Sequence, residues 1–215
     1  KTSYETAKTG REVVVDIFTQ DYDYTSEHYG RFRLELNTNA PPGTNPFILT
    51  YCSGTSGFNK QSLNANGSSL TKETVSDDKW HHYAVTCFTS GSDTIAEFYV
   101  DGTFDSRFKK ENQTVNPVNV YLNGRISSLG AATNDGSNSD AGGPGYGKLS
   151  AALDEVRIWK EKRTAEDIGN YFDNPVHGAS DKETINSVLG VYYKFNEGIV
   201  GDASKDKIIL DYSGR

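Results

Sequence analysis

The segment Gly30–Asn37, which reads GRFRLELN, decides how this chain folds. Apolar and charged residues alternate along it, with Phe32, Leu34 and Leu36 standing between Arg31, Arg33 and Glu35. Successive side chains of a β-strand point to opposite faces of the sheet, so this period of two predicts a strand with one buried and one polar face.

Similar strand-like runs recur along the chain, at Val13–Phe18, Phe47–Cys52, Trp80–Phe88, Ile95–Val100, Val118–Leu122, Leu153–Trp159 and Val188–Phe195. Breaks rich in Gly, Asn, Asp and Pro separate these runs. Asp101-Gly102 and Asn123-Gly124 directly follow two of them and are typical of tight hairpins, because these residue types tolerate positive φ. Many short strands with regular turns indicate an all-β sandwich or barrel.

One helix is predicted after the strand that ends at Trp159. Thr164 is a suitable N-cap, and Glu166 and Asp167 place negative charge in the first turn, where the helix dipole favours it. We expect this helix to end near Phe172, and a second short helical turn over Asp181–Asn186.

Composition limits the classes of partner. The chain has 215 residues, a formal net charge of -7 and a pI of about 5.1. Nucleic acids and anionic membrane surfaces attract Lys and Arg, so neither is expected as a partner. The sequence has no apolar run of about 18 residues, so no membrane insertion is expected. It begins at Lys1 and contains no methionine, from which we expect a piece of a longer protein.

Cys52 and Cys87 both lie in strand-like runs. Two thiols without a CxxC or Cys/His cluster argue against a zinc site. Two free cysteines and one disulfide between strands both remain open, because sequence does not supply the geometry of a disulfide.

Three motifs carry a family resemblance, and they occur in this order: Asp78–Thr86 with Ala96–Gly102, Leu153–Trp159 with Arg163–Ile168, and Leu189–Gly198 with Asp211–Gly214. They resemble motifs of the laminin-G-like domains of the concanavalin A-like lectin/glucanase superfamily. The resemblance implies a two-sheet antiparallel jelly-roll sandwich with one or two short helices, which agrees with the strand pattern.

We interpret residues 1–215 as a single domain of this kind, although the strands that open such domains are not evident before Val13. Two interpretations of residues 189–215 stay open. They either close the sandwich or begin a tandem copy of it.

Catalysis is not expected from this sequence. Glycoside hydrolases need two acidic groups about 5 to 9.5 Å apart, and no E-x-D-x-x-E or E-x-D-x-E array is present. Asp154 and Glu155 are adjacent and so would point to opposite faces of a strand. The histidines are not accompanied by a G-x-S-x-G nucleophile elbow.

Calcium is the cofactor that we expect, because it prefers carboxylate and carbonyl oxygens. The resemblance suggests a metal near the terminal strands, at Glu197, Asp202 and Asp211. A long loop without an apolar pattern offers further oxygens, on Asn134, Asp135, Asn138 and Asp140. The alternative is a solvated acidic surface.

A second loop is the expected ligand site, since it interleaves aromatic rings with carboxylates, at Asp21, Tyr22, Asp23, Tyr24, Glu27, His28 and Tyr29. Aromatic platforms beside hydrogen-bonding groups suit sugars. Tyr146 is a further candidate. The alternative is a tyrosine-rich loop that packs on its own sandwich. Trp80 and Trp159 are expected in or near the core.

These observations predict a non-catalytic binding or adhesion module that recognises a glycan or a protein surface. We expect it to belong to a larger extracellular, cell-surface or virion protein, with flanking domains or subunits. A structural spacer or assembly domain without a small ligand is the alternative, and a divergent glycoside hydrolase is a third. This architecture hosts all of these functions, so fold alone does not choose among them.

Overall fold

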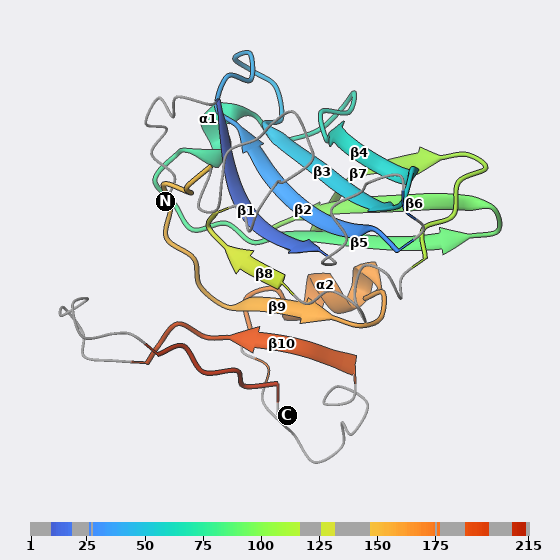
Figure 1. The fold of residues 1–215 in the computed structure, drawn as a ribbon. Coiled ribbons are helices and arrows are strands. Elements are labelled where there is room, and N and C mark those ends of the chain that lie inside the picture. The colour runs from blue at the N-terminus through green and yellow to red at the C-terminus, as the bar shows by residue number, and fades with distance from the viewer. Residues whose placement is uncertain are drawn as a thin grey trace. The chain divides into compact units, whose positions relative to one another are not determined.

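The computed structural model describes residues 10–18, 26, 28–116, 126–131, 147–174, 176, 188–197 and 208–213 (Figure 1). The chain divides into two compact units, Lys1–Ala151 and Ala152–Arg215. The interpretation of the chain as one domain stays a prediction.

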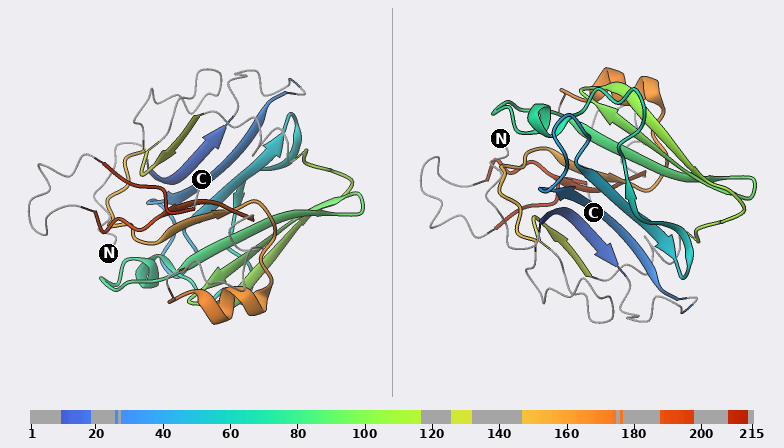
Figure 2. Two further views of the ribbon diagram at one scale, coloured as in Figure 1. Left: turned by 90° about the horizontal axis from the view of Figure 1, so that it is seen from below. Right: turned by 90° about the horizontal axis from the view of Figure 1, so that it is seen from above.

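Within its described residues, the first unit contains two antiparallel sheets. The larger has the strand order β4-β3-β2-β1-β8, formed by β1 (Arg11–Phe18), β2 (Gly30–Asn37), β3 (Phe47–Ser53), β4 (Ser56–Ser62) and β8 (Ile126–Leu129). The smaller has the order β5-β6-β7, formed by β5 (Tyr83–Ser90), β6 (Asp93–Val100) and β7 (Thr103–Lys110). The two sheets lie face to face as separate layers (Figure 2). A short helix, α1 (Lys72–Val75), precedes β5.

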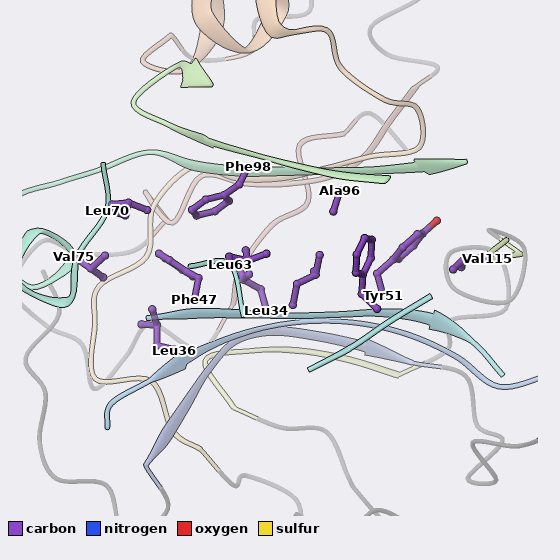
Figure 3. Close-up of a cluster of buried hydrophobic side chains, with 12 residues drawn as sticks. Leu34, Leu36, Phe47, Tyr51, Leu63, Leu70, Val75, Ala96, Phe98 and Val115 are labelled. Carbon is purple, nitrogen blue, oxygen red and sulfur yellow. The ribbon is translucent and has the colours of Figure 1, made fainter. Parts of the chain in front are cut away.

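The hydrophobic core of the first unit lies between these layers (Figure 3). The larger sheet contributes Leu34, Leu36, Phe47, Leu49, Tyr51 and Phe58, and the smaller sheet contributes Ala96 and Phe98. The ring of Phe47 lies 5.1 Å from that of Phe98, centroid to centroid, which joins the two layers. The mostly β, antiparallel sandwich predicted from the sequence is confirmed.

Strand β2 coincides with the segment GRFRLELN, and the other expected strands that the structure describes differ at their ends by a few residues. The sequence did not indicate β4, β7 or β8. Asp101 and Gly102 form the predicted hairpin turn between β6 and β7, with φ of 47° and 75°. The expected strand at 118–122, the turn at 123–124 and the helical turn at 181–186 lie outside the described residues.

The second unit pairs β9 (Val156–Trp159) with β10 (Leu189–Tyr193) and contains α2 (Ala165–Tyr171). The predicted N-cap is confirmed, since Thr164 Oγ1 accepts a hydrogen bond from Asp167 N at 3.1 Å and Asp167 Oδ2 accepts one from Thr164 N at 3.1 Å. This capping box satisfies two backbone donors that the first turn of a helix leaves open. The helix ends with Phe172 as its C-cap, as expected.

Trp80 is 64% exposed, so its assignment to the core was wrong. The strand begins at Tyr83, which leaves Trp80 in the preceding segment, where strand alternation does not apply. Cys52 and Cys87 are both free, which decides between the two alternatives for the thiols.

None of the described helices has the length and hydropathy needed to cross a bilayer.

Candidate functional site

The candidate site lies on the outward face of the five-stranded sheet. Phe32, Leu34 and Leu36 pack on the core side of β2, so Arg31 and Arg33 project from the opposite face. The same period of two places Thr50 and Cys52 of β3 on this outward face. One alternating pattern therefore separates the core from the site.

A buried ion-pair cluster anchors the two arginines. Asp16 of β1 is 0% exposed, and its carboxylate accepts hydrogen bonds from Arg31 Nε at 2.9 Å, Arg31 Nη2 at 2.8 Å and Arg33 Nη2 at 2.9 Å. Burial by itself lowers the pKa of Arg31, but Asp16 and Tyr29 more than offset it and raise that pKa above its ordinary value. The Arg31 guanidinium is therefore charged, and the hydrogen bonds to Asp16 hold both guanidinium groups in fixed positions.

Glu35 extends this cluster along β2. Its Oε1 lies 3.8 Å from Arg33 Nη1 and 4.0 Å from Arg11 Nη1. The residue is 1% exposed, and burial raises the pKa of its carboxyl group above the ordinary value. Glu35 therefore binds a proton more readily than an exposed glutamate does.

Beside the cluster lies a pocket of about 130 Å³. It is lined by residues of β2, β3, β4 and the adjoining turns, namely Tyr29, Arg31, Arg33, Thr50, Cys52, Gly54, Thr55, Gly57, Asn59 and Lys60. Thr55 and Asn59 are exposed, so solvent reaches this lining. This volume is close to the roughly 150 Å³ of a cavity that holds one benzene ring, so the pocket has room for a single six-membered ring.

A β-bulge in β4 shapes one wall of the pocket. Leu49 pairs with Gln61 and Tyr51 with Phe58, so Asn59 and Lys60 together oppose Thr50. Lys60 has a φ of 52°, and its N–H donates to Thr50 Oγ1 at 3.2 Å. A bulge redirects side chains, and here two consecutive residues line the same pocket, which a regular strand does not allow.

The lining offers hydrogen-bond donors and positive charge. Arg31, Arg33 and Lys60 are cationic, and none of the described residues in the lining carries a carboxylate. Burial raises the pKa of the Cys52 thiol to about 11, so this side chain is a neutral thiol near pH 7 and a poor nucleophile. The arrangement is suited to holding a polar ligand.

Of the residues predicted to bind a ligand, Tyr29 lines the pocket and is 5% exposed, whereas His28 is exposed and lies outside the lining. The others, Asp21, Tyr22, Asp23, Tyr24, Glu27 and Tyr146, lie outside the described residues. The predicted ligand site thus stays a prediction. Sequence reasoning missed the contributions of β3 and β4.

The predicted calcium ligands are only partly described. Asp211 Oδ1 accepts hydrogen bonds from Tyr192 N at 3.0 Å and Ser213 N at 2.9 Å, and Glu197 Oε1 accepts one from Leu210 N at 3.4 Å. The other candidates, Asp202, Asn134, Asp135, Asn138 and Asp140, lie outside the described residues. The part of the chain that the structure describes has no group of three or more His, Cys, Asp or Glu side chains placed for a metal ion, and the two carboxylates do not make a calcium site by themselves. Calcium binding stays a prediction.

A pair of carboxylates across two strands was also missed. A pattern within one strand does not reveal this pair, because Asp16 lies on β1 and pairs with Arg33, two residues before Glu35 on β2. Diagonal neighbours of this kind lie about 7–8 Å apart in a sheet. Neither Asp16 nor Glu35 is part of the pocket lining.

Two solved structures are similar to this chain. One is a candidate carbohydrate-binding protein from Bacteroides ovatus, with 18% identity and a TM-score of 0.45; the match covers 100% of this chain and 52% of that one. The other is an S-layer domain-containing protein from Clostridium thermocellum, with 20% identity and a TM-score of 0.34; the match covers 79% of this chain and 66% of that one. This chain thus spans about half the length of the first structure and less than two thirds of the second. No curated protein matches the sequence.

The family comparison is more decisive. Residues 22–169 match the laminin G family described as the concanavalin A-like lectin/glucanases superfamily. The matched region contains the three-stranded sheet, four strands of the five-stranded sheet (β2, β3, β4 and β8) and the motifs around Trp80 and Trp159, whereas β1 precedes it. Since the match covers well over half of its residues, the chain belongs to the concanavalin A-like lectin/glucanases superfamily.

Proposed function

We propose that the protein is a non-catalytic module that binds a saccharide in the pocket on the outward face of β2, β3 and β4. The observation that carries this proposal is the lining itself. Tyr29, Thr50, Thr55 and Asn59 supply hydroxyl and amide groups, and the arginines supply fixed donors. A sugar presents hydroxyl groups around its ring, and such convergent polar groups orient it.

The size of the pocket supports one sugar ring as the occupant. A cavity of roughly 150 Å³ holds a benzene ring, so 130 Å³ accepts the ring of one sugar and leaves some of its substituents at the open side of the pocket. The exposed side chains of Thr55 and Asn59 leave a path for the rest of a longer chain to continue into solvent.

The surrounding chemistry supports binding without catalysis. A glycoside hydrolase needs an acid and a second carboxylate at the bond that it cleaves. Asp16 is occupied by three hydrogen bonds from two arginines, and neither it nor Glu35 lines the pocket. Catalysis is therefore not part of this proposal.

A module of this kind would act within a larger extracellular, cell-surface or virion protein, next to flanking domains or subunits. The second candidate is a spacer or assembly domain that touches a protein surface instead of a glycan. Exposed apolar side chains near the end of the chain favour it, since Ile208 is 70%, Ile209 54% and Leu210 49% exposed. Neighbouring apolar side chains in solvent are typical of protein contacts.

A glycan array separates these candidates. The protein is compared with Asn59→Trp, which places a bulky ring in the pocket from an exposed position. The matched control is Ser62→Trp, because Ser62 is exposed on the same strand and lies outside the lining. We expect the wild type and Ser62→Trp to bind the same glycans, and Asn59→Trp to bind none of them.

Each contrary result has its own meaning. If the wild type binds no glycan of the array, with or without calcium, the result would favour the spacer or assembly role. Binding that survives in Asn59→Trp would place the saccharide elsewhere on the protein. Release of shorter sugars from a bound polysaccharide would restore the hydrolase alternative.

A further inference from the structure

We infer that the turn between β4 and α1 is a site of spontaneous covalent modification, at which Asn66 loses its side-chain nitrogen through attack by the main-chain nitrogen of Gly67. None of the residues of this turn lines the saccharide pocket, so the inference does not depend on the proposed function. It follows from the sequence of the turn and from which of its groups are hydrogen-bonded.

The reaction needs only the protein and water. The nitrogen of Gly67 bonds to Cγ of Asn66, the bond from Cγ to Nδ2 breaks, and the proton of the attacking N–H leaves with the side-chain nitrogen as ammonia. Because the reacting groups belong to adjacent residues, this step is intramolecular. One water then opens the resulting succinimide ring at either carbonyl carbon. One opening gives aspartate, and the other gives isoaspartate, whose main chain is longer by a methylene group.

Both reacting groups are free of hydrogen bonds to the described residues. The turn over residues 65–68 is closed by Ser68 N, which donates to Ala65 O at 3.1 Å. Neither the side chain of Asn66 nor the N–H of Gly67 takes part in a hydrogen bond in the part of the chain that the structure describes. Both residues are exposed. The turn thus forms without engaging either group, and water reaches both of them.

Glycine at position 67 favours the attack. Its φ is 88°, in the region that residues with a side chain rarely adopt. Apart from its chain neighbours, no atom lies within 4 Å of the place that a Cβ on Gly67 would take. The attacking nitrogen therefore approaches the Asn66 side chain without steric hindrance.

The neighbouring pair Asn64-Ala65 has the opposite arrangement. Oδ1 of Asn64 accepts a hydrogen bond from Asn45 N at 3.1 Å, and Ala65 N donates to Leu63 O at 3.1 Å. Attack at this pair requires that both hydrogen bonds break, which costs free energy. The structure therefore favours modification at Asn66 over modification at Asn64, although the two residues share one short segment.

The modification alters a link between the two sheets. Ser68 Oγ donates to Asp105 Oδ2 on β7 at 3.0 Å, and Ser69 N donates to Asp105 Oδ1 at 2.8 Å. Ser68 Oγ also accepts from Asn45 Nδ2, just before β3, at 3.4 Å. An additional methylene group in the main chain next to Ser68 shifts these donors. We expect the Ser69 N–H to exchange with solvent about 5- to 10-fold faster in the isoaspartate form, the factor for one lost hydrogen bond.

Peptide mapping of aged protein tests the inference. The folded protein is kept in neutral buffer at physiological temperature and compared with an unaged sample. Trypsin cuts after Lys60 and Lys72 and so releases residues 61–72 as one peptide, apart from the second Asn-Gly pair at Asn123-Gly124. Fragmentation of this peptide in a mass spectrometer locates the replacement of NH₂ by OH. We expect it at position 66, as both aspartate and isoaspartate, and not at position 64.

Two variants separate the structural argument from the sequence alone. Ala65→Gly creates a second Asn-Gly pair but keeps the hydrogen bonds around Asn64, so we expect position 64 to stay unmodified in the folded protein. In urea, where these bonds are absent, we expect positions 64 and 66 of this variant to convert at similar rates. Gly67→Ala is expected to lose most of the conversion at position 66.

Three results would overturn the inference. The first is no conversion at position 66 of the folded wild type while a synthetic peptide of residues 61–72 converts under the same conditions. The second is aspartate without isoaspartate, which indicates direct hydrolysis and not attack by Gly67. The third is equal conversion at positions 64 and 66 of folded Ala65→Gly, which would show that the hydrogen bonds do not protect Asn64. Unchanged exchange of the Ser69 N–H would contradict the effect on the link between the sheets.

Discussion

Both carboxylate oxygens of Asp16 accept hydrogen bonds from Arg31, at 2.9 Å from Nε and 2.8 Å from Nη2, across the neighbouring strands β1 and β2. The pair is almost completely buried, with side-chain exposures of 0% for Asp16 and 5% for Arg31. Removing one side of such a pair takes from a buried charge an oppositely charged partner at hydrogen-bond distance.

Asp16→Asn is therefore expected to lower the free energy of unfolding by about 3–5 kcal/mol, because two buried guanidinium groups lose their shared anion. Urea denaturation at neutral pH measures the change. Asp154→Asn, at an exposed carboxylate, serves as the control and should stay within about 0.5 kcal/mol. A loss below about 1 kcal/mol for Asp16→Asn would show that the cluster contributes little to stability.

Glu35→Gln is expected to change how stability depends on pH. The pKa of Glu35 is raised in the folded protein, so folding favours the protonated form. Its contribution to stability is fully present below the unfolded pKa, about 4.5, and is lost as pH rises through the higher folded value. The stability of the wild type relative to Glu35→Gln should thus fall as pH rises above 4.5, in denaturation experiments at a series of pH values.

Glu73→Gln is expected to show the opposite pH dependence of stability in the same experiments. Backbone N–H groups, its own and that of Gly43, lower the pKa of Glu73, so its contribution is present above the unfolded pKa and is lost as pH falls through the folded value. Equal slopes for the two variants would contradict the opposite pKa shifts on which this prediction depends.

Trp80→Ala is expected to change stability by no more than about 0.5 kcal/mol, because the side chain is 64% exposed. Phe98→Ala, at a core position that is 1% exposed, should cost about 3–5 kcal/mol under the same conditions. Thermal or urea denaturation distinguishes the two values easily. A loss of several kcal/mol of stability for Trp80→Ala would show that the side chain of Trp80 is packed in the core.

Calcium is expected to stabilise the protein if the predicted ligands bind it. Extracellular modules bind calcium with dissociation constants of about 10⁻⁴–10⁻³ M, so 10 mM calcium would add roughly 1.4–2.7 kcal/mol of stability. Melting curves in calcium and in a chelator measure the difference. Asp202→Ala and Asp135→Ala, each in one of the two predicted ligand sets, identify which set binds the ion. Identical melting curves of the wild type in both buffers would contradict calcium binding.

Local patterns predicted the parts of the fold that depend on neighbouring residues in the chain. The alternation of Gly30–Asn37 defined β2 and its two faces, Thr164 and Asp167 marked the start of α2, and Asp101-Gly102 marked a hairpin. In each case the signal and the structure lie within a few residues of one another, so no information from distant segments is needed.

Features that depend on a partner strand could not be predicted in this way. The segment Ser56–Ser62 is polar and lacks alternation, and only its pairing with β3 makes it a strand with a bulge. The same holds for the pocket, because its lining combines strands that are adjacent only in the folded sheet. Trp80 shows the converse, since an apolar residue close to a strand was assigned to the core although the strand begins later.

The bulge opposite Thr50 separates the positions that shape the pocket from those that build the core. Asn59 and Lys60 can be exchanged without disturbing Phe58, which packs in the core from the same strand. A few substitutions on the outward side of these strands can thus change the chemistry of the pocket while the apolar side, and with it the scaffold, stays the same.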